Sequence, residues 1–110
     1  MVDEHDDDRP DWADEVQELY EKARQATGAG RWLALVLRAA RIELSGREEI
    51  LHAAKYLGGL AGESPDGRSF GRTAAEYRRM AACERRHVEF LRGLVLGLRG
   101  VRDRAKGGGG

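Results

Sequence analysis

Residues 73–100, TAAEYRRMAACERRHVEFLRGLVLGLRG, decide the fold class that this sequence predicts. The stretch begins with Thr73 and has Glu76 three residues later, which is the capping-box pattern of a helix start. Apolar residues then recur at helical spacing from Ala74 to Leu98. Gly100 is the residue type at which helices commonly end. The stretch therefore predicts one helix about 37 Å long, at 1.5 Å per residue.

Three shorter helices are expected before this long one. Apolar residues recur at helical spacing in residues 11–27, 31–44 and 46–57. Ser45 and Glu48 form a second capping-box pattern, which predicts that the third of these helices starts there. No stretch alternates apolar and polar residues over six or more positions, so strands are not expected. The sequence therefore predicts an all-α fold, a compact four-helix bundle with a long C-terminal helix.

The bundle is expected to form a single domain over residues 11–100. Residues 1–10 are acidic and predict a disordered tail, and residues 101–110 predict a second disordered tail that is basic and then glycine-rich. Residues 61–72 form a long connection that contains a Pro-Asp-Gly turn. Because such a connection is longer than most bundle loops, it is a candidate binding segment.

The charge of the chain is neutral in sum but divided between its two parts. Residues 1–67 contain fifteen acids and eight Lys or Arg, which gives a net charge of −7. Residues 68–110 contain eleven Lys or Arg and four acids, which gives a net charge of +7. An asymmetry of this size indicates an interaction surface for a partner of opposite charge.

Composition excludes several classes of protein. The longest apolar run has six residues, Trp32 to Leu37, whereas a membrane-spanning helix needs about 20. The acidic N-terminus does not resemble a secretory signal, and Cys83 is the sole cysteine, so a reducing cytoplasm is expected. The arginine-, alanine- and glycine-rich composition is typical of a bacterial protein. No motif indicates a reaction, so we expect neither an enzyme nor a cofactor.

An arginine ridge follows the predicted long helix. Four of its members repeat every seven residues and therefore lie on one side of the helix, and two more lie beside them. The arginine ridge consists of Arg78, Arg79, Arg85, Arg86, Arg92 and Arg99. Such a row can bind the phosphates of DNA or RNA, or the carboxylates of an acidic protein partner. Few aromatic residues are interleaved with it, although single-strand binders usually have them.

Glu84 and His87 are the candidate metal ligands of the sequence. Glu-x-x-His places both side chains on one helix face, and ferritin-like bundles bind metals through this pair on two helices. A second pair, Glu49 and His52, lies on a different face from the apolar residues of its own helix. The alternative is a hydrogen-bonded polar pair that sets the register of the bundle. The pair interrupts an otherwise apolar stripe expected to face inward: Tyr77, Met80, Glu84, His87, Leu91, Leu94 and Leu98.

Three functions are compatible with these features. The leading hypothesis is a small non-catalytic protein–protein interaction or assembly subunit, a homo-oligomer whose first and last helices pair through opposite charges. The alternative is a helical nucleic-acid-binding subunit that uses the arginine ridge, and the third is a carboxylate–histidine metal protein. No membrane partner is expected. The residues expected to form the buried core, in the subunit or between subunits, are Trp12, Trp32, Leu33, Val36, Leu91, Leu94, Val95 and Leu98.

Overall fold

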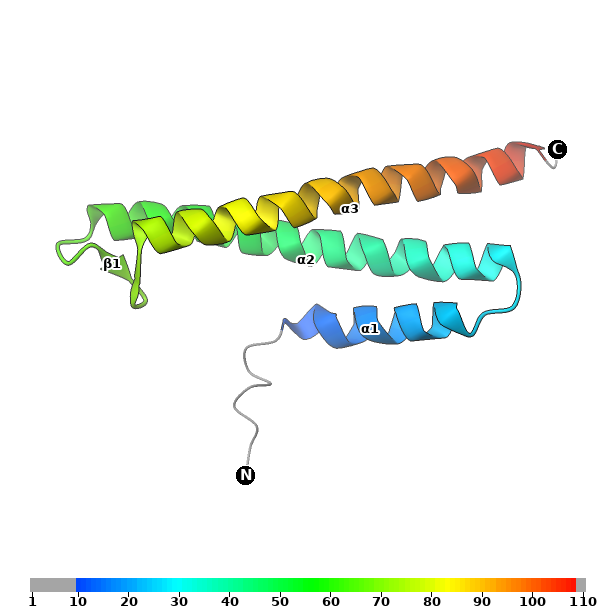
Figure 1. The fold of residues 1–110 in the computed structure, drawn as a ribbon, viewed down its shortest axis with the longest axis horizontal. Coiled ribbons are helices and arrows are strands. Elements are labelled where there is room, and N and C mark those ends of the chain that lie inside the picture. The colour runs from blue at the N-terminus through cyan, green and yellow to red at the C-terminus, as the bar shows by residue number, and fades with distance from the viewer. Residues whose placement is uncertain (1–9, 109–110) are drawn as a thin grey trace, which may run out of the picture. The chain divides into compact units, whose positions relative to one another are not determined.

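The computed structural model describes residues 10–108, which are almost entirely helical (Figure 1). The all-α prediction is confirmed, but the described residues form three helices and not four. A short antiparallel hairpin of two strands joins the second helix to the third. The elements are α1 (Asp11–Arg24), α2 (Ala29–Glu63), β1 (Arg68–Ser69), β2 (Arg72–Thr73) and α3 (Ala74–Gly108). The predicted acidic tail, except Pro10, lies outside the described residues.

The chain divides into two compact units. The first contains the residues up to Gly46 and those from Leu91 onward, and the second contains Arg47–Phe90. Helices α2 and α3 each contribute residues to both units. The range 11–100, expected as one domain, therefore spans the two units. No helix in the described part of the chain is both long enough and apolar enough to cross a membrane.

Helix α2 is continuous where the sequence predicts two helices. Ser45 is exposed and lies inside the helix, so the predicted helix start at Ser45 and Glu48 is wrong. Small and apolar residues recur at spacings of three and four on both sides of this point, and the seven residues from Leu44 to Leu51 make two helical turns, so the same helical face stays inward. The residues that carry this pattern are Leu37, Ala40, Leu44, Leu51, Ala54, Gly58 and Ala61.

Gly46 is a packing residue in the middle of α2. A Cβ atom built on Gly46 would overlap the indole ring of Trp12, which comes from α1. Glycine weakens a helix interior, but it is the residue that allows another group to approach the backbone this closely. Gly46, which the sequence analysis placed at a helix boundary, therefore allows α1 to pack closely against α2.

The core of the first unit consists of two small clusters. In one, Val16 and Leu19 of α1 pack on Ala39 of α2, with Trp12 and Tyr20 at its edge. The Tyr20 hydroxyl lies 3.5 Å from Glu43 Oε1, and burial, followed by the charge of this carboxylate, raises the Tyr20 pKa. The other cluster contains Leu37, Ala40 and Val95. Trp32, expected in the core, is 44% exposed, because neither cluster extends to the first turn of α2.

In the second unit, the end of α2 packs against the start of α3 through small residues. Ala54 and Ala61 of α2 form a buried cluster with Tyr77 and Ala81 of α3. Gly58 lies so close to α3 that a Cβ atom there would be 3.1 Å from Tyr77 Cβ. Small side chains let the two helix backbones approach, so the long side chains of α3 extend outward from this contact.

The predicted start of α3 is correct, but its predicted end is not. The capping box at its start is confirmed, since the Thr73 N–H donates to Glu76 Oε1 and the Glu76 N–H to Thr73 Oγ1, at 3.1 and 3.2 Å. Its end at Gly100 is wrong, because Gly100 does not adopt the positive φ of a helix-ending glycine. Residues 101–108, expected in a disordered tail, are helical.

Gly46→Ala should destabilise the protein because the new methyl group displaces the Trp12 indole. Overpacking of this kind costs about 1–3 kcal/mol, more than alanine gains through its helix propensity. Thermal unfolding monitored by tryptophan fluorescence measures the change. Gly59→Ala is the matched control in the same helix, because no atom lies within 4 Å of its added Cβ, and it should stabilise α2. A Gly46→Ala variant as stable as Gly59→Ala would contradict this account.

Candidate charged interface

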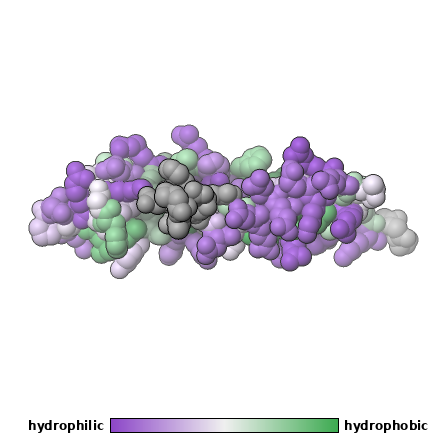
Figure 2. Space-filling view, turned by 90° about the horizontal axis from the view of Figure 1, so that it is seen from below, coloured by the Kyte–Doolittle hydropathy of each residue, from purple (hydrophilic) through white to green (hydrophobic). Residues whose placement is uncertain are grey.

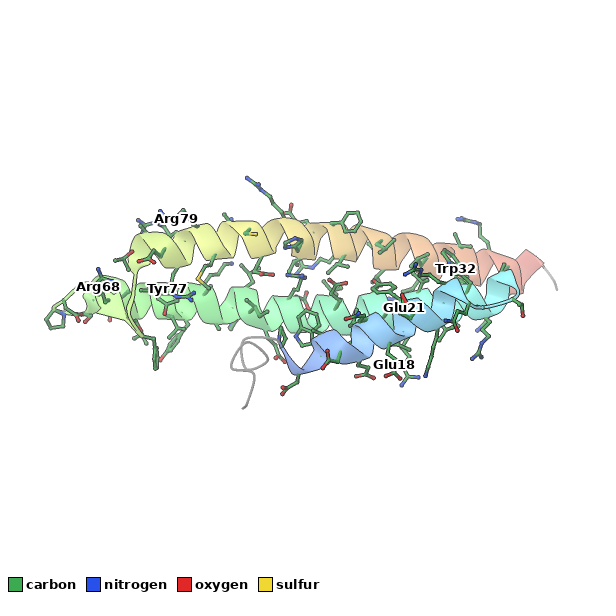
Figure 3. All side chains as sticks on the ribbon, turned by 60° about the horizontal axis from the view of Figure 1, so that its bottom comes forward. Glu18, Glu21, Trp32, Arg68, Tyr77 and Arg79 are labelled. Carbon is green, nitrogen blue, oxygen red and sulfur yellow. The ribbon has the colours of Figure 1, made fainter. Side chains whose placement is uncertain are left out.

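The arginine ridge lies on the outside of α3. All six arginines are exposed; Arg92 and Arg99 belong to the first unit and the other four to the second. We call the four in the second unit the ridge arginines: Arg78, Arg79, Arg85 and Arg86. Arg79 points away from α2 (Figure 3). The ridge arginines are therefore presented to solvent and not used to hold the two helices together.

The ridge arginines are not neutralised within their own unit. Between residues 47 and 90, none of the four has a carboxylate oxygen within 4 Å. Arg79 acts on Glu76 only at longer range. The hydrogen bonds from the Thr73 N–H and hydroxyl are the main cause of the lowered Glu76 pKa, and the charges of Arg68 and Arg79 add to it. The positive charge of the row is therefore available to a partner.

A groove of about 420 Å³ lies beside the ridge arginines in the second unit. Its floor is formed by small residues of both helices, among them Ala54, Gly58 and Ala81. Arg78 and Arg85, together with Lys55 of α2, also line it. The groove therefore combines an apolar surface with three cations, which suits an acidic side chain that has an aliphatic stem.

The connection before α3 contains a cationic hairpin with an aromatic tip. Ser69 pairs with Arg72 and Arg68 with Thr73, so Phe70 and Gly71 form the two-residue turn. Phe70 is 86% exposed and has φ +49°, a backbone conformation that a bulky residue rarely adopts. Residues in such conformations occur preferentially at binding sites.

Hydrogen bonds hold this hairpin in place. The Tyr77 hydroxyl donates to the Ser69 carbonyl at 2.7 Å and joins the hairpin to α3, where Tyr77 is buried (Figure 3). The Asp66 carboxylate accepts from the Ser64 hydroxyl at 2.6 Å and from the Arg68 N–H at 3.1 Å. These two bonds, in that order, lower the pKa of Asp66. Phe70 is thus exposed on an anchored turn.

The sequence indicated residues 61–72 as a binding segment but not the hairpin inside it. Two-residue hairpin turns usually carry Asn-Gly or Asp-Gly, and here the pair is Phe70–Gly71. Both residues of the turn have positive φ, a conformation that glycine adopts readily. Gly71 is therefore the one conventional signal of this turn in the sequence. An aromatic residue between two arginines is also the feature that the arginine ridge itself lacks.

Glu84 is paired with an arginine that the sequence did not identify. Arg47 Nη1 of α2 lies 3.0 Å from Glu84 Oε1 and 3.3 Å from Oε2, and both side chains are largely shielded from solvent. The same guanidinium atom is 3.5 Å from His87 Nδ1, and His87 Nδ1 is 4.0 Å from Glu84. The arrangement is that of a hydrogen-bonded polar cluster between two helices.

The inward face of α3 differs from the predicted stripe. His87 is exposed, whereas its neighbour Val88 is 1% exposed. The small residues of α2 admit the face of α3 that carries Tyr77 and Ala81. The buried positions of this face are four, seven, three and four residues apart: Tyr77, Ala81, Val88, Leu91 and Val95. In the described part of the chain, no three His, Cys, Asp or Glu side chains are grouped so that they could hold a metal ion.

The outer face of α1 is acidic. Its buried residues, Val16, Leu19 and Ala23, face the core. Glu18 pairs with Lys22 at 3.4 Å and Glu21 with Arg24 at 2.6 Å, in both cases within α1. Hydrophilic residues cover this helix in the view in which it faces the reader (Figure 2). The exposed acids of this face are Asp11, Asp14, Glu15, Glu18 and Glu21.

Arg47→Met should destabilise the second unit by about 1–3 kcal/mol, because it removes the guanidinium that satisfies the shielded Glu84 carboxylate. The double variant Arg47→Met/Glu84→Leu should recover most of this loss, since an apolar pair needs no partner. Arg86→Met, at an exposed site, is the control, and chemical denaturation measures all three. Stoichiometric iron, manganese or zinc in the native protein, lost in the variant Glu84→Leu/His87→Met, would contradict the interpretation of Glu84 as part of a polar pair.

The second unit thus contains a row of arginines, a groove lined by cations and an aromatic hairpin, and the first unit contains an acidic helix face. No protein-family model matches the chain, and no curated protein and no solved structure shows significant similarity to it.

Proposed function

We propose that this protein is a non-catalytic assembly subunit in which the acidic face of α1 pairs with the ridge arginines of another copy. One observation carries the proposal: the ridge arginines are exposed and have no ion pair within their own unit. The charges in an isolated row of arginines repel one another, and the approach of carboxylates lowers the free energy of the row. The acidic face of α1 supplies such carboxylates.

The spacing of the opposite charges supports this pairing. Asp11 and Glu18 are seven residues apart in α1, and Arg78 and Arg85 are seven residues apart in α3. Seven residues of helix rise by about 10.5 Å, so each acid can meet one arginine when the two helices lie side by side. Asp14 and Glu21 repeat the same spacing, as do Arg79 and Arg86.

Exposed apolar side chains in the first unit also favour association. Trp32 and Val101 are each 44% exposed, and Leu96 is 67% exposed. Exposed apolar side chains that form a contiguous patch mark interaction surfaces on soluble proteins. Burial of such side chains contributes about 25 cal/mol per Å² and would add stability to a contact that charge complementarity orients.

Charge reversal should disrupt the assembly and a charge swap should restore it. The native protein should be a dimer or a larger oligomer at micromolar concentration. Arg78→Glu/Arg85→Glu and Asp11→Lys/Glu18→Lys should each weaken self-association by about tenfold or more, because like charges then face each other. The variant with all four changes should associate again. Light scattering over a range of protein and salt concentrations measures the mass of the native protein and of each variant in solution.

The control is Arg31→Glu/Lys106→Glu, which makes the same change in net charge at exposed positions outside the ridge. It should leave the mass of the oligomer unchanged. A native protein that stays monomeric throughout the range would contradict the proposal. So would a control that dissociates as readily as the ridge variant.

Phe70 favours one second function, the binding of single-stranded DNA or RNA. The side chain projects from a turn between Arg68 and Arg72, so a base could stack on the ring while the arginines contact phosphates. The ridge arginines follow in the same unit. This hairpin adds the aromatic residue expected of a single-strand binder.

For this second function, Phe70→Ala should weaken binding of a fluorescent single-stranded oligonucleotide by about 1–3 kcal/mol, the value of one stacked base. Phe90→Ala is the control, because Phe90 is another exposed phenylalanine of the same unit. Anisotropy titrations should also give a log–log salt slope of about −3 to −5 if four to six phosphates are contacted. Equal effects of the two alanine substitutions would argue against the hairpin as a base-stacking site.

A further inference from the structure

A second groove, in the first unit, is lined by three arginines. It has a volume of about 490 Å³, and its cations are Arg38 and Arg41 of α2 and Arg102 of α3. Ala34, Leu37 and Ile42 complete the lining. The site lies in the first unit and contains none of the ridge arginines.

The charge of this groove is largely uncompensated. Arg38 and Arg41 are exposed, and neither has an ion pair with a described residue of the first unit. Arg102 Nε lies 3.4 Å from the Asp103 carboxylate, which is itself well exposed. No carboxylate belongs to the lining. Three guanidinium groups around one hollow repel one another, and a bound anion would remove that repulsion.

We infer that this groove binds a small organic phosphate monoester, with the phosphoryl group on Arg38, Arg41 and Arg102 and an apolar body on Ala34, Leu37 and Ile42. A monoester carries a charge of about −1.5 to −2 near neutral pH, which matches three cations better than a carboxylate or a phosphodiester does. The planar guanidinium fork binds phosphate oxygens in pairs.

The size of the groove also indicates a small molecule. Sites for such ligands usually have volumes of about 300–1,000 Å³, and they combine apolar walls with a few polar groups that orient the ligand. An inorganic phosphate ion would fill only part of this groove. An aromatic ring or a short aliphatic group attached to the phosphate would cover the apolar residues as well.

Titration of the full-length, isotope-labelled protein with phenyl phosphate, followed by NMR, tests this inference. The signals of Arg38, Arg41 and Arg102 should shift in a saturable way. Inorganic phosphate, dimethyl phosphate and benzoate should each bind about tenfold more weakly or worse, because each lacks either the apolar body or the second negative charge. Equal affinity for phenyl phosphate and any of these three probes would overturn the proposed ligand class.

Arg38→Gln/Arg41→Gln should weaken phenyl phosphate binding by about tenfold or more, since two charge-assisted contacts are lost. Arg31→Gln/Arg104→Gln is the matched control, because it removes the same amount of charge from the two helices that line the groove, at positions outside the lining. Ala34→Glu, at an exposed lining position, should also abolish binding by placing a carboxylate beside the arginines, and it serves if the first variant does not fold. Absence of saturable binding by the native protein, or equal weakening in the control, would overturn the inference.

Discussion

The contact between the Trp12 indole and the bare backbone of Gly46 is the interaction on which the first unit depends. It sets where α1 lies along α2, and it explains why a glycine sits in the interior of a long helix. Once the indole is in place, Val16 and Leu19 face Ala39, and the acids of α1 must face water. The proposed interaction surface of α1 therefore follows from one aromatic side chain packed on one glycine.

Small residues have the corresponding role in the second unit. Ala54, Gly58 and Ala61 let the start of α3 approach the end of α2, so this contact needs few large side chains. The ridge arginines are consequently placed outside the contact, where their charges remain in a high dielectric. Arg47 and Glu84 are the exception, because each shielded charge has the other as its partner.

Charge in this molecule acts in three distinct settings. Between Arg47 and Glu84 it is shielded and paired, and it contributes to the register of two helices. On α1 and along the ridge arginines it is exposed, and there it can orient a partner more effectively than it can stabilise the fold. Around the groove of Arg38, Arg41 and Arg102 it is concentrated and has no carboxylate in the lining, which is the arrangement that favours a small anion. The same residue type thus has different roles according to what surrounds it.

The sequence by itself determined the all-α class, the acidic first helix, the exposed arginine row and the capping box of Thr73 and Glu76. These features depend on local periodicity and on contacts between residues three or four positions apart, which can be read along one segment. It could not show that Ser45 and Gly46 lie inside a helix, because the group that packs on Gly46 is Trp12, more than thirty residues away. Only the tertiary structure paired Glu84 with Arg47, moved His87 to the surface and gathered three arginines around one groove. Each of these depends on which face of one helix meets the next, and that is decided by long-range packing.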